Sequence, residues 1–259
     1  MKAESPLVAD PQEILDQGFV LVRQAIGSER LDPLRETTEL FLQRARAQTP
    51  GDRNIGWDNH RVPHPGLYDF VDGDTNALFD ALVAAPLLAV NCQLMGAESV
   101  GLNSASLFTE PARKLKKRFQ FHRDFSPIAS LPLCGLQADC QANAPGHLTW
   151  NFALYDDASL WVVPGSNKRA NNATEQKVLD PPGKLADAPL PGAVPIELAA
   201  GDAVAFDATM LHSGSNDSDT YRRTFNASYR AFGGPVFPHN RTTSWQPDIR
   251  TRLLPYSAG

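Results

Sequence analysis

One short segment constrains the fold of this chain more than any other. Residues 119–125 read Phe-Gln-Phe-His-Arg-Asp-Phe, so that Gln120, His122 and Asp124 alternate mainly with phenylalanines. Side chains at positions i and i+2 of a β-strand point to the same face, so the alternation predicts a strand with these three polar residues on one side. A histidine and a carboxylate that converge in this way can supply two ligands to a metal ion.

A third ligand is available at His212, which follows the mainly apolar run 203–211. Two histidines and one carboxylate form the facial triad that binds non-haem iron(II). A His-x-Asp pair alone is weak evidence, because most such pairs are solvated or structural. Three later features add weight to it: Pro-Gly-Ser at 164–166 ends a strand-like run, Gly-Asp at 201–202 opens the predicted strand that leads to His212, and Arg223 lies eleven residues beyond that histidine.

In this order, these elements resemble the phytanoyl-CoA dioxygenase family of non-haem iron, 2-oxoglutarate-dependent oxygenases. The resemblance spans about residues 17–232. It implies a mainly β fold, a double-stranded β-helix (a cupin-like jelly roll) with flanking N-terminal helices. It also implies Fe(II), the cosubstrate 2-oxoglutarate and dioxygen, with His122, Asp124 and His212 as the catalytic metal ligands.

Strand alternation selects the arginine that would hold the cosubstrate. On the predicted strand 222–232, Arg222 shares a face with polar residues, whereas Arg223 shares one with a phenylalanine, an alanine and a tyrosine. A buried guanidinium must be paired, and its planar fork suits the remote carboxylate of 2-oxoglutarate. Arg223 also matches the family position, so it is predicted to bind that carboxylate. Approximate position in the family adds three cosubstrate contacts: Thr149, which would assist Arg223, and Thr109 or Gln120.

The aspartate of the triad favours hydroxylation of an unactivated C–H bond in a small metabolite or natural-product intermediate. Halogenases related to this family carry a small residue in place of the carboxylate, which opens a site for chloride, so Asp124 argues against halogenation. Desaturation, epimerisation and cyclisation use the same triad and stay open. A non-catalytic jelly-roll binding module is weakened by the complete set of site residues. A cupin-type metal enzyme without 2-oxoglutarate does not account for Arg223.

Two segments bear on the substrate. Residues 113–118 hold five cations in six positions, directly before the His-x-Asp strand. Such a run is most often a solvated loop, but at the mouth of an active site it would attract an anionic small molecule. The polar segment 168–195 is rich in proline and glycine and long for a loop. An active-site lid and an ordinary surface loop fit this composition equally well.

The chain is expected to form one domain, residues 1–259. Helical periodicity predicts a helix within 31–48 and two helical segments within 76–95, so the helical part covers about 1–98, the jelly-roll core about 99–232 and a tail 233–259. No run approaches the roughly 18 apolar residues of a membrane span, and no apolar h-region follows the first residues, which favours a cytoplasmic protein without a membrane partner. The net charge of −5 argues against a nucleic-acid partner. Three cysteines without Cys-x-x-Cys spacing argue against a disulfide framework or a structural zinc site.

Overall fold

The computed structural model describes residues 7–48, 76–109, 118–124, 145–180, 184–215, 221–231 and 256–257. The helices of these ranges are α1 (Pro11–Gln17), α2 (Ser28–Gln48), α4 (Asn76–Leu82), α5 (Ala85–Met95), the 3-10 turn η1 (Ser166–Lys168) and α7 (Ala173–Leu179). The strands are β1 (Phe19–Val22), β2 (Ser99–Thr109), β3 (His147–Ala153), β4 (Leu160–Val162), β5 (Val194–Pro195), β6 (Ala203–Asp207), β7 (His212–Gly214), β8 (Arg223–Ala231) and β9 (Tyr256–Ser257).

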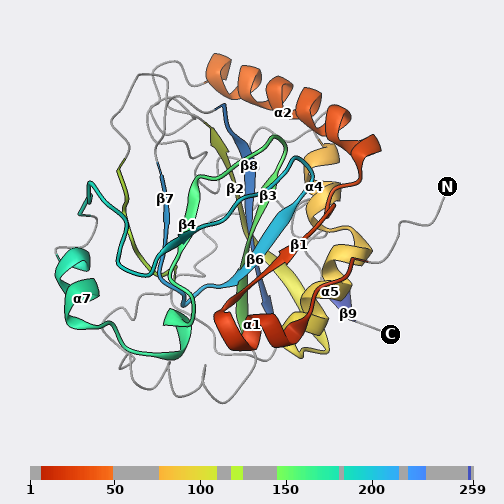
Figure 1. Cartoon of the computed structure of the whole chain (residues 1–259). Helices are drawn as coiled ribbons and strands as arrows, with labels where there is room; N and C mark the ends of the chain where they lie inside the picture. The colour runs from red at the N-terminus through yellow and green to blue at the C-terminus, as the bar shows by residue number, and fades with distance from the viewer. Residues whose placement is uncertain are drawn as a thin grey trace.

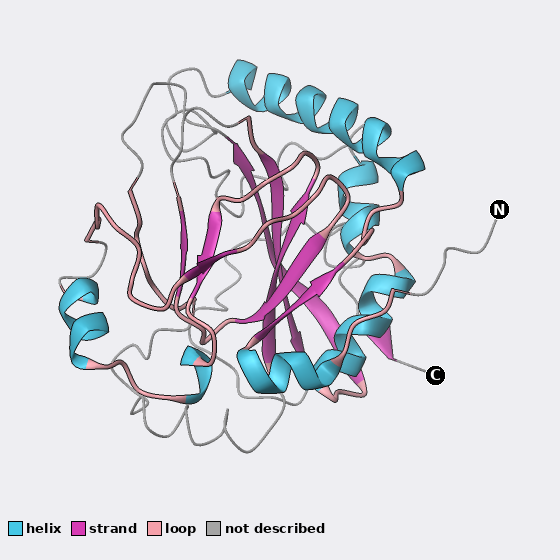
Figure 2. Cartoon of the chain, viewed as in Figure 1, coloured by secondary structure: helices cyan, strands magenta, loops and turns pink. Residues whose placement is uncertain are grey.

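Two antiparallel sheets form the centre of the molecule (Figures 1 and 2). The larger sheet has the strand order β1-β6-β3-β8-β2-β9, and the smaller has the order β5-β4-β7. The His-x-Asp segment extends the smaller sheet, because His122 forms a bridge with His212 at the start of β7. The predicted mainly β architecture with N-terminal helices is confirmed, although the described strands do not close into a continuous barrel.

Helices α4 and α5 lie against one side of the larger sheet, and β4 and β7 lie on its other side (Figure 1). The predicted interruption of the helical segment 76–95 is confirmed, because Pro86 stands in the first turn of α5 and leaves α4 as a separate helix. Helix α1 begins at Asp10, whose carboxylate accepts a hydrogen bond from the backbone N–H of Gln12 at 2.8 Å. It ends at Gly18, which has a left-handed φ of 87°.

The two faces of the larger sheet differ in polarity. On the helix side, Trp150 and Phe152 of β3 and Tyr229 of β8 lie in one apolar cluster with leucines of the helices. The opposite face carries small polar residues, since Thr149 of β3 lies directly across from Ser228 of β8. Polar side chains therefore line part of the space between the two sheets, which suits a site for a metal ion or a polar ligand.

The run 203–211 does not form the single strand that was expected to lead to His212. Strand β6 ends at Asp207, where the backbone N–H and the hydroxyl of Thr209 donate to the Asp207 carboxylate at 2.8 and 2.7 Å. This local hydrogen bonding competes with strand pairing and turns the chain. The chain then crosses to the smaller sheet and presents His212 there.

The segment 168–195 is also more ordered than its composition suggested. It contains α7, which starts with a capping box: the Asn172 side chain accepts from the Glu175 N–H, and the Glu175 carboxylate accepts from the Asn172 N–H. Glu175 is buried and paired with Arg169 at 2.6 Å. A role as an active-site lid stays a prediction. None of the helices among the described residues is long and apolar enough to cross a membrane.

Candidate metal centre

The three predicted metal ligands lie together between the two sheets. The backbones of His122 and His212 exchange hydrogen bonds of 2.9 and 3.0 Å, so their side chains leave the sheet side by side, with ring centroids 4.3 Å apart. Asp124, two residues beyond His122, places its Oδ1 atom 3.4 Å from Nε2 of His212 and 3.7 Å from Nε2 of His122. One candidate ligand atom from each residue lies within 4.8 Å of the other two.

Both histidines are held in the tautomer that a metal ligand needs. Nδ1 of His122 lies 2.8 Å from the carbonyl oxygen of Gln120, and Nδ1 of His212 lies 3.0 Å from that of Met210. A carbonyl oxygen only accepts hydrogen bonds, so each Nδ1 carries the proton and each Nε2 presents its lone pair to the centre. Such fixation of the second ring nitrogen is typical of metal-bound histidine.

The carboxylate of Asp124 is oriented from the larger sheet. The hydroxyl of Thr149 donates to its Oδ2 atom at 2.7 Å, which leaves Oδ1 directed at the two histidines. Burial acts to raise the pKa of Asp124, but His212, His122 and the Thr149 hydroxyl outweigh it and hold that pKa far below its ordinary value. The residue is therefore an anion and offers one oxygen to a cation.

These donors fit a divalent first-row metal ion. Imidazole nitrogens and carboxylate oxygens bind such ions at about 2.1 Å, so neighbouring ligand atoms around one ion lie about 3 Å apart, close to the separations from Asp124. His212 is almost fully buried, whereas 48% of the His122 side chain and 33% of the Asp124 side chain are exposed. The centre is thus fixed from one side and accessible from the other, as a catalytic rather than a purely structural site requires.

Arg123, between the two ligands of the His-x-Asp motif, anchors this strand to the rest of the protein. Its buried guanidinium donates to the carbonyl oxygens of Ser166 and Thr209 and, at 2.7 Å, to the side-chain oxygen of Asn171. Ser166 in turn accepts a hydrogen bond from the backbone N–H of Leu211, next to His212. The Pro-Gly-Ser segment and the central arginine therefore place both halves of the centre relative to each other.

Replacing Arg123 with methionine is expected to lower the free energy of unfolding by about 2 to 6 kcal/mol, because two buried carbonyl oxygens each lose a charged donor at a cost of about 1 to 3 kcal/mol. Urea unfolding measures this loss. Arg118→Met is the control, since Arg118 pairs with Asp187 where both side chains are largely exposed, and it should cost less than about 1 kcal/mol. Equal losses in the two variants would refute the anchoring role.

The structure does not bring Arg223 to the metal centre, and its predicted placement needs correction. Its guanidinium lies on the helix side of β8, where Nε donates to Glu39 of α2 at 2.6 Å and the group stacks 4.3 Å from the centre of the Tyr221 ring. The predicted alternation along the strand is right, and Arg223 is buried. The apolar face it shares is, however, the one that packs on the helices.

Arg222 is the arginine that reaches between the sheets. Its Nε atom donates to the Thr224 hydroxyl at 3.3 Å and lies 3.6 Å from the Asp157 carboxylate. Its Nη1 atom lies 3.8 Å from the position that a Cβ atom on Gly214 would occupy, so the guanidinium extends from β8 across to β7. Gly214 follows His212 by two residues on the same face of β7, about 7 Å along the strand, so the guanidinium lies beside the strand that carries His212.

The remaining predicted contacts are distributed as follows. Thr149 lies at the centre, but it donates to Asp124 and not to an arginine. Thr109 pairs directly with Arg223 across β2 and β8, so it shares the helix-side face and lies away from the triad. Gln120 orients His122 through its backbone carbonyl. Of the basic run 113–118, only Arg118 belongs to the part of the chain that the structure describes.

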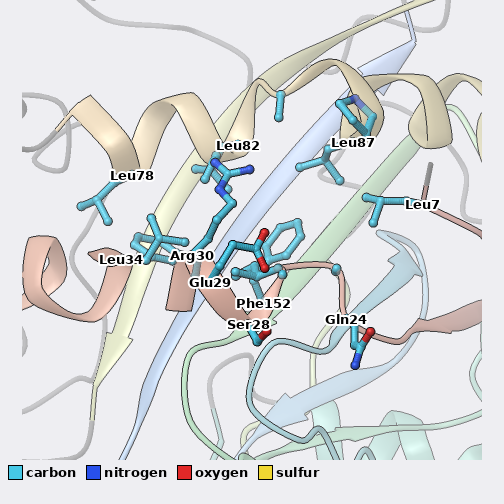
Figure 3. A pocket seen from close by; sticks show the side chains of 17 residues that line it. Leu7, Gln24, Ser28, Glu29, Arg30, Leu34, Leu78, Leu82, Leu87 and Phe152 are labelled. Carbon is cyan, nitrogen blue, oxygen red and sulfur yellow. The ribbon is translucent and has the colours of Figure 1, made fainter. Parts of the chain in front are cut away.

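A cavity of about 270 Å³ lies elsewhere, between α2, α4, α5 and the outer face of the larger sheet. Figure 3 shows Leu34, Leu78 and Leu82 around it, with Phe152 in its floor and the charged Glu29 and Arg30 at the start of α2. Phe152 belongs to the helix-side face of β3, whereas the metal ligands face the opposite side. The cavity is therefore separate from the metal centre.

Two sheets that enclose a two-histidine, one-carboxylate cluster define the class of non-haem iron enzymes with a jelly-roll fold. The family model of phytanoyl-CoA dioxygenase (PhyH) matches residues 14–224, which is most of the chain. The chain belongs to this family and is thus an Fe(II)- and 2-oxoglutarate-dependent enzyme of the oxygenase class. The predictions of the family, of its cofactors and of the jelly-roll fold are confirmed.

Solved structures agree in fold at low sequence identity. EctD from S. alaskensis, crystallised with 2-oxoglutarate and 5-hydroxyectoine, is 17% identical, with a TM-score of 0.62 and coverage of 92% of this chain and 80% of that chain. The carbocyclase SnoK from nogalamycin biosynthesis is 20% identical, with a TM-score of 0.59 and coverage of 95% and 90%. The epimerase SnoN, in complex with Fe3+, alpha ketoglutarate and nogalamycin RO, is 17% identical, with a TM-score of 0.54 and coverage of 85% and 82%. A comparison with curated protein sequences finds no match.

Proposed function

We propose that the protein hydroxylates an unactivated C–H bond of a small metabolite or natural-product intermediate, with His122, Asp124 and His212 as the ligands of iron(II). The observation that carries this proposal is the convergence of two Nε2 lone pairs and one carboxylate oxygen at a partly accessible point between the sheets. Three ligands on one face of an octahedral ion leave the other positions for cosubstrate and dioxygen. When bound, iron(II) and 2-oxoglutarate supply the oxidising chemistry by coupling dioxygen to oxidative decarboxylation of the cosubstrate to succinate.

The protein's own residues would position these groups. The carbonyl oxygens of Gln120 and Met210 hold the two imidazole rings, and Thr149 holds the carboxylate, so the donor atoms need little reorganisation when the ion binds. The threonine also occupies one oxygen of Asp124, which favours binding of the metal through the other oxygen. A single-oxygen carboxylate ligand leaves more of the coordination sphere free for reaction.

We assign the remote carboxylate of 2-oxoglutarate to Arg222 in place of Arg223. The Nε edge of the Arg222 guanidinium is already fixed by Thr224 and Asp157, and its Nη1 atom points to the smaller sheet beside Gly214. Burial lowers the pKa of Arg222, and the negative charge of Asp157 acts to raise it. A further anion near the guanidinium would stabilise its charged form. A guanidinium binds a carboxylate through two parallel charge-assisted hydrogen bonds. The absence of a side chain at Gly214 leaves room for the ligand between Arg222 and His212.

Desaturation, epimerisation and cyclisation are the second candidates, and the last two are the reactions for which the structurally similar SnoN and SnoK are named. The carboxylate ligand Asp124 leaves halide no vacant position and so argues against halogenation, whereas hydroxylation, desaturation, epimerisation and cyclisation are separated by the product. A purely binding role is disfavoured by the ordered tautomers of both histidines, since a non-catalytic module has no need for two exposed lone pairs beside an anion.

The proposed reaction type predicts oxygenated products even in excess chloride. Asp124 fills the ligand position that a halide would need, so the substrate product should gain oxygen and no chlorine. Mass spectrometry of the product of a substrate that stimulates succinate formation measures this. A chlorinated main product would refute the assignment of Asp124 as a ligand, and a product with a new double bond, an inverted centre or a new ring would replace hydroxylation by the corresponding second candidate.

A further inference from the structure

A second pair of polar side chains, one of them an arginine, lies on the metal side of the larger sheet, farther along β8 from Arg222 than the metal centre is. His147 is the first residue of β3 and Arg230 lies directly opposite it on β8. His147 precedes Thr149 by two residues, and residues separated by two share a face of a strand. Because Thr149 donates to Asp124, both His147 and Arg230 lie on the metal side of the larger sheet.

The positions along β8 place the metal centre between the two arginines. Ser228 lies across from Thr149, at the level of Asp124, and Arg230 lies two residues, or about 7 Å, farther along the strand. Arg222 lies six residues in the other direction, and its side chain turns back toward Thr224. An arginine side chain can span about the distance of two strand residues, so the Arg230 guanidinium can approach the exposed side of the metal centre.

The surroundings of this second pair suit an anionic ligand. Gly101 of β2 lies on the other side of Arg230 in the sheet and contributes no side chain that would fill the space. His147 is buried, with 7% of its surface exposed, whereas Arg230 is partly exposed. Burial lowers the pKa of His147 to about 3. The negative charge of Asp124 acts to raise this pKa, and the positive charge of Arg230 acts to lower it. The imidazole is thus neutral and can donate one hydrogen bond without bringing a second positive charge beside the guanidinium.

We propose that Arg230 and His147 form the subsite that binds an anionic group of the substrate, a carboxylate or a phosphate, and so direct a nearby C–H bond to the metal centre. This inference rests on the proposed function, because it assigns the group that binds the primary substrate beside the same metal centre. The two arginines of one strand would then divide the anions between them: Arg222 binds the cosubstrate and Arg230 binds the substrate. A guanidinium fork recognises both carboxylate and phosphate through paired hydrogen bonds.

Calorimetric titration of the anaerobic protein, loaded with Fe(II) and saturated with 2-oxoglutarate, tests this subsite. The probes are hexanoate, hexyl phosphate and the neutral hexanamide. Saturation with 2-oxoglutarate prevents the anions from binding at Arg222. We expect one of the two anions to bind at least about tenfold more tightly than the amide, and the preferred anion identifies the group that the substrate carries.

Arg230→Gln should remove this preference, and His147→Gln should reduce it, while the affinity for 2-oxoglutarate stays unchanged in both. Arg118→Gln is the control, because Arg118 is exposed and pairs with Asp187 instead. An Arg230→Gln variant that keeps the anion preference, or a wild-type protein that binds all three probes alike, overturns the inference. If Arg230→Gln weakens 2-oxoglutarate as strongly as the anion probe, the arginine serves the cosubstrate and the inference is again overturned. Failure of the wild type to bind 2-oxoglutarate at all would instead contradict the proposed function.

Discussion

His212→Ala is expected to abolish substrate turnover and to reduce the affinity for Fe(II) by more than about a hundredfold, because even the loss of a group that only orients a metal ligand costs about 10- to 100-fold. The fold should survive, since the alanine keeps the backbone hydrogen bonds with His122 that join the two strands. Succinate formation and the Fe(II) content after dialysis measure the two losses. Circular dichroism verifies that the variant is folded.

His147→Gln is the matched control for the iron measurement. It removes a buried histidine from the same face of the larger sheet, but His147 does not belong to the cluster of metal-ligand atoms found among the described residues. Iron binding should therefore be retained. An iron-loaded, active His212→Ala variant would mean that the cluster formed with His122 and Asp124 is not the metal site.

Arg222→Lys is expected to weaken 2-oxoglutarate binding by about ten- to hundredfold while leaving iron binding intact. Lysine keeps the charge but loses the bidentate geometry, and the loss of a charge-assisted hydrogen bond costs about 1.5 to 3 kcal/mol. The concentration of 2-oxoglutarate that gives half-maximal succinate formation measures the effect. Arg223→Lys is the control on the adjacent position of the same strand, and it should leave this concentration unchanged, because Arg223 is paired with Glu39 on the helix side.

The convergence of the proposed metal ligands could be predicted from the sequence because strand alternation is local. Spacing alone places His122 and Asp124 on one face, and the ordered family elements supply His212. The hydrogen bonds that hold these ligands were harder to predict, although both involve the carbonyl oxygen two residues before the histidine, at Gln120 and Met210. That pattern depends on backbone conformation, which no residue type in the sequence specifies.

The arginine was misplaced because alternation tells which residues share a face but not which face lines the cavity. Arg223 was chosen since its neighbours are apolar and were expected to be buried, yet both faces of β8 are buried. The strand pairing resolves the question: Thr149, which holds Asp124, lies across from Ser228, and Ser228 shares its face with Arg222. In the sequence, the small or polar residues Thr149, Asn151 and Ala153 alternate with Trp150, Phe152 and Leu154, and it is the small polar set that faces the metal centre; the same criterion applied to β8 selects Arg222.

Other features of the fold depend on contacts between residues that are far apart in the sequence, and composition does not reveal these contacts. The turn at Asp207 that carries the chain from one sheet to the other depends on hydrogen bonds from Thr209 and Asn167 to a buried carboxylate. The short strand β9 adds only two residues to the edge of β2, too few for a periodic pattern. The anchoring role of Arg123 could not be predicted, because its carbonyl acceptors at Ser166 and Thr209 are brought to it only by the fold.

The most direct test of the whole account is a titration of 2-oxoglutarate into the anaerobic Fe(II)-loaded protein, followed through the visible metal-to-ligand charge-transfer band. Wild type and Arg223→Lys should give the same saturating curve, Arg222→Lys should require about ten- to hundredfold more 2-oxoglutarate, and His212→Ala should give no band. A wild-type protein without the band would contradict the proposed cosubstrate site. A displaced curve for Arg223→Lys, with Arg222→Lys like wild type, would contradict the assignment of Arg222.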